Sequence, residues 1–211
     1  MFETILWFFL IFSIALNILL FKELKKENET NNFIETILDK WVSDEVCEKR
    51  KYKTLFNKYD INTPLRIAHF MAQIEHESAG FKYLKELGGH KYLDKYDTGK
   101  LAKDLGNTPE DDDDGQKYCG RGYIMITGLF NYKELSKATG IDFVKYPELL
   151  EQEANAIIAA LWYWDKHKLN TLADQDNIKL ITKKINGGYN GLADRIKKLE
   201  VLQKTFTTKN N

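Results

Sequence analysis

The stretch RIAHFMAQIEHESAG, residues 66–80, decides the fold of this chain. Apolar side chains recur in it at three- and four-residue spacing, at Ile67, Phe70, Met71 and Ile74. This spacing is typical of an amphipathic helix. Asn62 or Thr63, followed by Pro64, is a helix start signal. Glu77 falls on the apolar face just before Gly80, where the helix can end, so the pattern predicts a helix that aims a carboxyl group at the core.

A carboxyl group in that position has a chemical use. Burial against apolar side chains favours the protonated form of a carboxylic acid, which a general acid requires. The alternative is a glutamate at a frayed helix end, paired with a nearby Arg or Lys. A zinc-protease motif is excluded because Gly80 stands where the second His is needed. His69 and His76 are two turns apart, but no third ligand has recognisable spacing, so no metal is predicted.

The chain opens with an uncharged apolar run, ILWFFLIFSIALNILLF, at residues 5–21. About 20 such residues span a bilayer, so the sequence predicts a single N-terminal transmembrane helix over residues 4–21. A cleaved signal peptide and a buried core helix are the alternatives. Lys22, Lys25 and Lys26 on the C-terminal flank would keep the following domain in the cytoplasm under the positive-inside rule. Residues 22–33 are charged and amide-rich, and we expect a polar linker there.

Composition excludes several classes of protein. The chain has 211 residues, with 31 basic and 31 acidic side chains and two cysteines. It is therefore neither a disulfide-dense scaffold nor a generally basic nucleic-acid-binding protein, and no nucleic acid is expected as a partner. The charge is polarised: 10 basic against 4 acidic residues from Lys166 onward give +6, which balances −6 before it. Cys47 and Cys119 are expected to be thiols rather than a bridge.

The middle of the chain, from Glu86 to Tyr118, is rich in Gly and Asp, and we expect loops with short elements. The acidic run at 110–114 resembles a calcium loop, but position twelve would be Arg121 where an EF-hand needs Glu. A solvated acidic turn is therefore favoured over weak cation binding. The following stretch, YCGRGYIMITGLFNY (118–132), alternates over residues 123–127 and predicts a short strand.

Four blocks, taken in order, resemble a known family. They are RIAHFMAQIEHESAGF (66–81), KYCGRGYIMITGLFNY (117–132), ANAIIAALWYWDKH (154–167) and ITKKINGGYNGLADR (181–195). Together they are similar to the family 19 glycoside hydrolases, which include chitinases and the chitinase-like endolysins of phages. The resemblance implies a mainly α, lysozyme-like domain with short strand and loop elements, covering residues 34–208 behind the transmembrane helix.

The resemblance also implies a catalytic site without a cofactor. Glu77 matches the general acid, Glu86 takes the place of the second carboxylate, and Thr127 matches the hydroxyl that orients the attacking water. The implied mechanism is inverting, with the two carboxyl groups roughly 6.5–9.5 Å apart. Asp94 and Asp97 are fallback bases, and a surface glutamate is the alternative interpretation of Glu86.

Further matches imply a sugar cleft. Tyr123, Asn131 and Asn186 correspond to positions that line the cleft or bond the sugar, and Tyr118 and Tyr132 are candidates for stacking on sugar rings. Arg121 and Arg195 are expected to pair with carboxylates, while Trp162 and Trp164 are expected in the core. Met125 departs from the glutamine usual in the family and removes a polar contact to substrate.

Two polymers fit an acid–base pair of this kind, peptidoglycan and chitin. A modest, membrane-anchored chain favours peptidoglycan, and thus a phage or virus lysin in a virion membrane or the host inner membrane, with its domain facing the wall. The competing class is an anchored structural or wall-binding virion protein that keeps the fold and has lost turnover. Met125 favours that class, whereas Glu77, Glu86 and Thr127 together favour an enzyme. The sequence indicates no oligomeric state.

Overall fold

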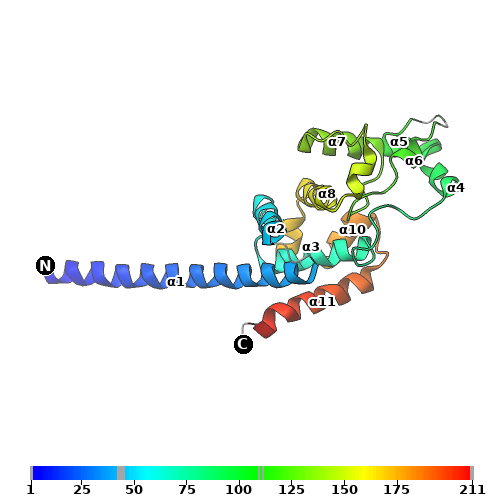
Figure 1. The fold of residues 1–211 in the computed structure, drawn as a ribbon. Coiled ribbons are helices and arrows are strands. Elements are labelled where there is room, and N and C mark those ends of the chain that lie inside the picture. The colour runs from blue at the N-terminus through cyan, green and yellow to red at the C-terminus, as the bar shows by residue number, and fades with distance from the viewer. Residues whose placement is uncertain (1, 42–45, 109, 111, 210–211) are drawn as a thin grey trace.

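The structure is a computed structural model that describes the backbone of residues 2–41, 46–108, 110 and 112–209, and the side chains of 15–39, 51–108, 110 and 112–206. The described chain is mainly helical (Figure 1). Its elements in order are α1 Phe2–Trp41, α2 Val46–Lys58, α3 Pro64–Glu77, α4 His90–Leu93, η1 Asp94–Tyr96, α5 Gly99–Leu105, α6 Asp114–Lys117, α7 Leu129–Thr139, η2 Pro147–Glu151, α8 Glu153–Lys166, α9 Leu169–Asp174, α10 Ile178–Asn186 and α11 Leu192–Lys209, where η marks a 3-10 helix.

Helix α3 begins where the sequence predicts. Thr63 is its N-cap, with its Oγ1 accepting the N–H of Arg66 at 3.3 Å, and Pro64 occupies the first turn. The helix ends at Glu77 rather than at Gly80. At that end the hydroxyl of Ser78 donates to the carbonyl of Ile74 at 2.6 Å, and the backbone has left the helical region. Glu77 is therefore the last helical residue.

The core is built around α3. The ring of Phe70 packs edge-to-face against Phe56 of α2, with centroids 5.8 Å apart, and against Trp164 of α8, at 5.3 Å. Helix α11 lies along α3 on the other side (Figure 1). Trp162 and Trp164 are both buried, as predicted. A central helix covered on several sides fixes the position of its last residue, Glu77.

Helix α1 projects from the body as one continuous helix (Figure 1). Where side chains are described, no helix is both apolar enough and long enough to cross a bilayer. The predicted transmembrane helix over residues 4–21, and the single-pass membrane localisation derived from it, are therefore wrong. Side chains are described for residues 15–21 of that segment, and charged residues follow from Lys22. This described apolar run is much shorter than the roughly 20 residues that a span needs. Residues 4–14 of the prediction lie outside the described side chains.

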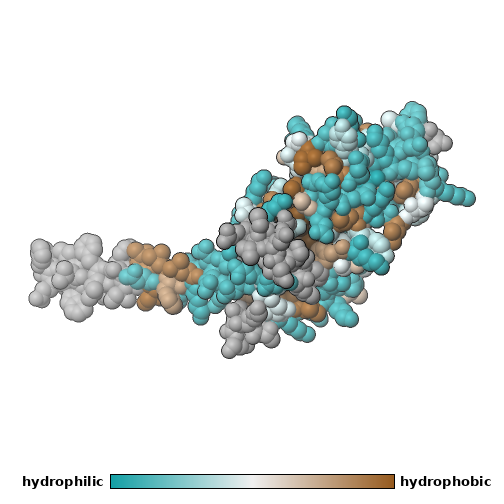
Figure 2. Space-filling model, viewed as in Figure 1, coloured by the Kyte–Doolittle hydropathy of each residue, from teal (hydrophilic) through white to brown (hydrophobic). Residues whose placement is uncertain are grey.

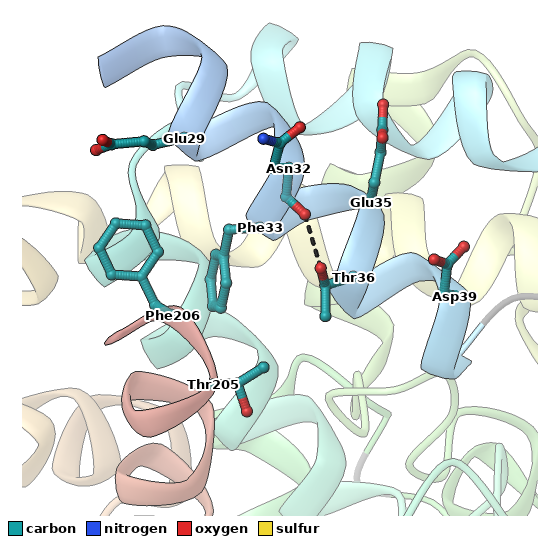
Figure 3. Close-up of a pocket in the computed structure, with 8 residues that line it drawn as sticks. All are labelled: Glu29, Asn32, Phe33, Glu35, Thr36, Asp39, Thr205 and Phe206. Carbon is teal, nitrogen blue, oxygen red and sulfur yellow. Dashed lines mark hydrogen bonds between the residues drawn. The ribbon is translucent and has the colours of Figure 1, made fainter. Parts of the chain in front are cut away.

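The segment predicted as a polar linker, residues 22–33, is helical and belongs to α1. Figure 2 shows its hydrophilic surface next to a hydrophobic band on the projecting part of the helix. Thr30 is the first buried residue in the part of α1 whose side chains are described. Phe33 then packs edge-to-face on Phe206 of α11, with centroids 5.3 Å apart. Beside this pair, a cavity of about 260 Å³ opens between the two helices (Figure 3), and none of the predicted site residues lines it.

The strand expected over residues 123–127 is absent from this described segment. Residues 121–126 form a tight turn, closed by the Arg121–Ile126 bridge and joined to Lys85 by a second isolated bridge. Positive φ angles of 74° at Gly122 and 53° at Met125 make the chain turn rather than extend. The turn brings the segment around residue 120 against the segment around Glu86.

Candidate active site

The carboxyl group of Glu77 forms an ion pair. Its Oε1 accepts from Nη2 of Arg195 at 2.5 Å, and the Glu77 side chain is 16% exposed. The structure therefore contains the pairing with an arginine that the sequence left as the alternative, and Arg195 pairs with a carboxylate as expected. Because a guanidinium fork has fixed geometry, it holds the carboxyl group in one orientation.

Arg195 is supplied by α11 and is fully buried. Its Nη1 donates to Oε1 of Gln73 at 2.5 Å, and the amide nitrogen of Gln73 lies 3.5 Å from the hydroxyl of Thr182 in α10. Gln73 was not identified from the sequence, although it stands four residues before Glu77 and thus on the same helix face. Three helices together therefore orient Glu77.

Glu86 lies in the loop after α3, and donors surround its carboxylate. Oε1 accepts from the hydroxyl of Tyr96 at 2.9 Å and from Nζ of Lys95 at 3.4 Å, both in η1. Oε2 accepts from the backbone N–H of Gly120 at 3.2 Å. Tyr96 and Lys95 were not identified from the sequence, because they lie in a segment without helical or strand periodicity. The side chain of Glu86 is therefore anchored on both oxygens.

Thr127 and Glu86 converge on Gly120. A Cβ atom placed on Gly120 would lie 3.2 Å from Oε2 of Glu86 and 3.2 Å from Oγ1 of Thr127. The hydroxyl of Thr127 donates to the carbonyl of Met125 at 2.9 Å. The structure thus brings together two of the three residues predicted as catalytic, around a residue without a side chain.

Tyr163 of α8 is half-buried near Glu77. Burial raises the pKa of Tyr163 to about 12, and the negative charge of Glu77 adds to the effect. The Tyr163 hydroxyl donates to the carbonyl of Lys184 at 3.0 Å. This neighbour, also missed from the sequence, connects the acid side of the site to α10.

The fallback bases Asp94 and Asp97 support the acidic loop. Asp97 is buried and accepts from the backbone N–H groups of Asp113 and Gly115. Asp94 accepts from the amide of Gln116 at 2.6 Å. The local role of both carboxylates is to hold residues 113–116 in place.

The two tyrosines expected to stack on sugars are buried. Tyr132 has no exposed surface, and its hydroxyl donates to the carbonyl of Cys119 at 2.8 Å. Tyr118 packs edge-to-face against Tyr132 and is only 3% exposed. Neither ring can receive a sugar in this structure, so the stacking prediction is wrong for both.

The remaining predicted binding residues are divided between core and surface. Arg121 is buried and pairs with Glu151 at 2.8 Å, as expected of an arginine that binds a carboxylate. Tyr123 is buried with its ring edge-to-face on Phe81. Asn131 donates to the carbonyl of Thr127 at 2.9 Å, and Met125 is partly buried. Asn186 ends α10 and is exposed. Contact of these residues with substrate stays a prediction.

Histidines and cysteines do not assemble a metal site in the described part of the chain. The ring of His69 pairs with Asp176 at 2.7 Å, and that of His76 pairs with Asp194 at 2.6 Å. Cys119 is a buried free thiol whose pKa is raised by burial. The side chain of Cys47 lies outside the described residues.

Similarity to known proteins identifies the family of this chain. Residues 45–190 match the model of the glycoside hydrolase 19 family, described as chitinase class I. The chain belongs to glycoside hydrolase family 19. Among its relatives, a Haemophilus influenzae family 19 domain-containing protein is 34% identical over 161 residues, covering 65% of this chain and 78% of that protein. An Arabidopsis thaliana endochitinase is 30% identical over 123 residues, covering 58% of this chain and 39% of that protein.

Solved family 19 structures show the same fold. Chitinase C from Streptomyces griseus superposes with a TM-score of 0.55 at 24% identity, covering 68% of this chain and 73% of that one. A class IV chitinase from Zea mays gives 0.52 at 23% identity, covering 68% and 69%. The predicted family, its helical fold and the glycosidase class are therefore confirmed, whereas the transmembrane part of the predicted fold is not.

Proposed function

We propose that this family 19 glycosidase hydrolyses the β-1,4 bonds of N-acetylhexosamine polymers with inversion, using Glu77 as general acid and Glu86 as general base. The observation that carries the proposal is the convergence of Glu86 and Thr127 on Gly120. We place the attacking water on these two groups, where Thr127 orients it and Glu86 deprotonates it.

Glu77 acts at the other side of the scissile bond. Since Arg195 contacts Oε1, we place the transferred proton on Oε2, from which it passes to the glycosidic oxygen as the bond to the anomeric carbon breaks. The water oxygen attacks that carbon from the opposite face, and its proton passes to Glu86. The Gly120 N–H and the Tyr96 hydroxyl hold Glu86 during the transfer.

Peptidoglycan is the proposed polymer, with chitin as the alternative. The support is electrostatic: residues from Lys166 onward carry a net charge of +6, and a positive surface attracts an anionic wall polymer more than neutral chitin. The role of a phage or virus lysin stays a prediction.

The test is release of reducing ends by the full chain from peptidoglycan and from chitin oligomers, with proton NMR of the first anomer formed. Glu77→Gln is expected to lower kcat by 10²-fold or more, as loss of a general acid does. Glu75→Gln is the matched control, because Glu75 lies two residues away and pairs with Lys198 instead. Release of the retained anomer, or equal activity of Glu77→Gln, would refute the mechanism.

Binding without turnover is the second candidate function, and Met125 favours it because it replaces a polar side chain in the turn beside Thr127. The same assay separates the two. If the unmodified chain co-sediments with either polymer and releases no reducing ends, the protein is a glycan-binding module.

A further inference from the structure

Exposed side chains along α10 and in the loop that follows it form a cationic aromatic surface outside the site described above. We call it the lysine–tyrosine patch; it consists of Lys179, Lys183 and Tyr189. Nζ of Lys179 lies 5.3 Å from the centroid of the Tyr189 ring, and Nζ of Lys183 lies 6.0 Å from it. The ring is 46% exposed, and both lysines are exposed. Two ammonium groups and one aromatic face are thus open to solvent together.

The charge of the patch is not neutralised locally. Helix α10 carries three lysines and no acidic residue, and no ion pair among the described residues includes Lys179 or Lys183. The two lysines are four residues apart on one helix face, where like charges repel and destabilise the helix. Local destabilisation of this kind is typical of a functional surface. The positive charge of the patch favours an anionic ligand.

The patch borders the acid side of the catalytic site. The carbonyl of Lys184, next to Lys183, accepts from the hydroxyl of Tyr163, whose ring lies near Glu77. On the other side of the loop that bears Tyr189, Gly191 packs so closely on His76 that a Cβ would lie 2.1 Å from its Nε2. The loop is therefore held on both sides by neighbours of Glu77.

We propose that the lysine–tyrosine patch binds an anionic substituent of the substrate glycan, with a sugar face on Tyr189 and a carboxylate between Lys179 and Lys183. This inference rests on the proposed function and assigns specificity to residues outside its acid–base machinery. The ligand class is a polymer of N-acetylhexosamines that carries carboxylates, as the stem peptides of peptidoglycan do and as chitin does not. Charge-assisted hydrogen bonds to a carboxylate are the strong kind.

The first test compares three substrates: peptidoglycan, the same peptidoglycan with its carboxyl groups chemically amidated, and chitin oligomers. Lys179→Gln/Lys183→Gln is expected to raise KM on native peptidoglycan about tenfold at low salt, with kcat unchanged. On the amidated and chitin substrates we expect no change, because neither offers the anion. Raising the salt concentration should raise the KM of the unmodified chain on native peptidoglycan. It should also remove the difference in KM between the unmodified chain and the lysine variant.

The matched control is Lys22→Gln/Lys26→Gln. It removes the same charge with the same four-residue spacing from exposed positions of α1, which projects away from the body (Figure 1). An equal effect of this control would mean that general attraction, not the patch, determines KM, and would overturn the proposal. An equal rise in KM on native and amidated peptidoglycan, or no rise on either, would also overturn the proposal.

A binding measurement keeps the inference separate from catalysis. Full-length Glu77→Gln is co-sedimented with native and amidated peptidoglycan, with and without Lys179→Gln/Lys183→Gln. Retention on the native polymer that falls severalfold with the lysine changes supports the patch even if no polymer is cleaved. If the unmodified chain cleaves chitin oligomers but its inactive form binds both peptidoglycans equally, the proposed glycosidase stands and the patch does not.

Discussion

Glu86 and Gly120 are joined by two hydrogen bonds. The backbone N–H of Glu86 donates to the carbonyl of Gly120 at 2.8 Å, and the N–H of Gly120 donates to Oε2 of Glu86 at 3.2 Å. Backbone and side chain of the proposed base are thus both fixed by one residue, which lies 34 positions further along the chain.

Gly120→Ala is therefore expected to reduce catalysis while keeping the fold. The added Cβ would lie 3.2 Å from both Glu86 Oε2 and Thr127 Oγ1, so one or both must shift. A 1 Å misplacement of catalytic groups costs about 10²-fold in rate, and because the shift required here is a few tenths of an ångström we expect kcat to fall severalfold. Gly89→Ala is the control, because its Cβ would meet nothing within 4 Å. Unchanged kcat in Gly120→Ala would show that this contact does not set the position of the base.

Arg195→Met is expected to lower the free energy of unfolding by about 3–5 kcal/mol, because it leaves the carboxylate of Glu77 without its buried partner. Adding Glu77→Gln to Arg195→Met should recover part of the lost free energy of unfolding. We expect urea unfolding of the single and double variants to give a coupling energy of about 1–3 kcal/mol between the two residues. Arg66→Met breaks the more exposed pair with Asp174 and should cost about 1 kcal/mol or less. Equal costs for the two arginines would contradict the buried network.

Tyr132→Phe tests whether the hydroxyl of this residue serves the core or the sugar. The variant loses the hydroxyl bonded to the Cys119 carbonyl and to Arg121, so we expect about 1–3 kcal/mol less stability. KM should not change, because the ring is buried. Tyr146→Phe, at an exposed position, should leave both quantities unchanged. A severalfold rise in KM at constant stability would instead assign the hydroxyl to sugar binding.

Stability should depend on pH through His69. Burial lowers the pKa of His69 below its usual 6.5, against the opposing effect of Asp176. Below about pH 6.5 the unfolded chain therefore binds a proton at His69 more readily than the folded chain does. The contribution of His69 to the free energy of unfolding is complete above about pH 6.5 and is lost as pH falls through the folded pKa. Urea unfolding between pH 7.5 and 5.5 measures the slope of the free energy of unfolding against pH. For one proton this slope is at most about 1.4 kcal/mol per pH unit.

His69→Gln should flatten that slope, because glutamine does not titrate in this range. His90→Gln is the control, since the ring of His90 is largely exposed. An unchanged slope in His69→Gln would assign the pH dependence to other groups.

Sequence reasoning succeeded where the information was local. The stripe from Ile67 to Ile74 repeats within one helix, so α3 and its cap could be predicted from spacing alone. The partners of Glu86 could not, because Tyr96 and Gly120 reach it from loops whose paths no periodicity encodes. The sequence also could not tell a buried aromatic ring from an exposed one, which explains the error at Tyr118 and Tyr132.

The error in α1 has a different cause. The segment 22–33 is polar enough for a solvated stalk, yet Lys, Glu and Leu are good helix formers, and Lys25 lies 3.9 Å from Glu29 one turn on. The polarity of residues 22–33 therefore indicated exposure to solvent, but it did not exclude a helix. For residues 123–127, alternation resembled a strand, whereas the positive φ angles of Gly122 and Met125 produce a turn.

The bond between Glu77 and Arg195 joins residues 118 positions apart. During synthesis, the proposed acid emerges long before the arginine that orients it, and α11 must dock on α3 before the pair can form. A nascent chain stopped before Leu192 would carry all three predicted catalytic residues and still lack an oriented acid. The oriented acid therefore forms only after the chain has been made past Arg195 and α11 has docked on α3.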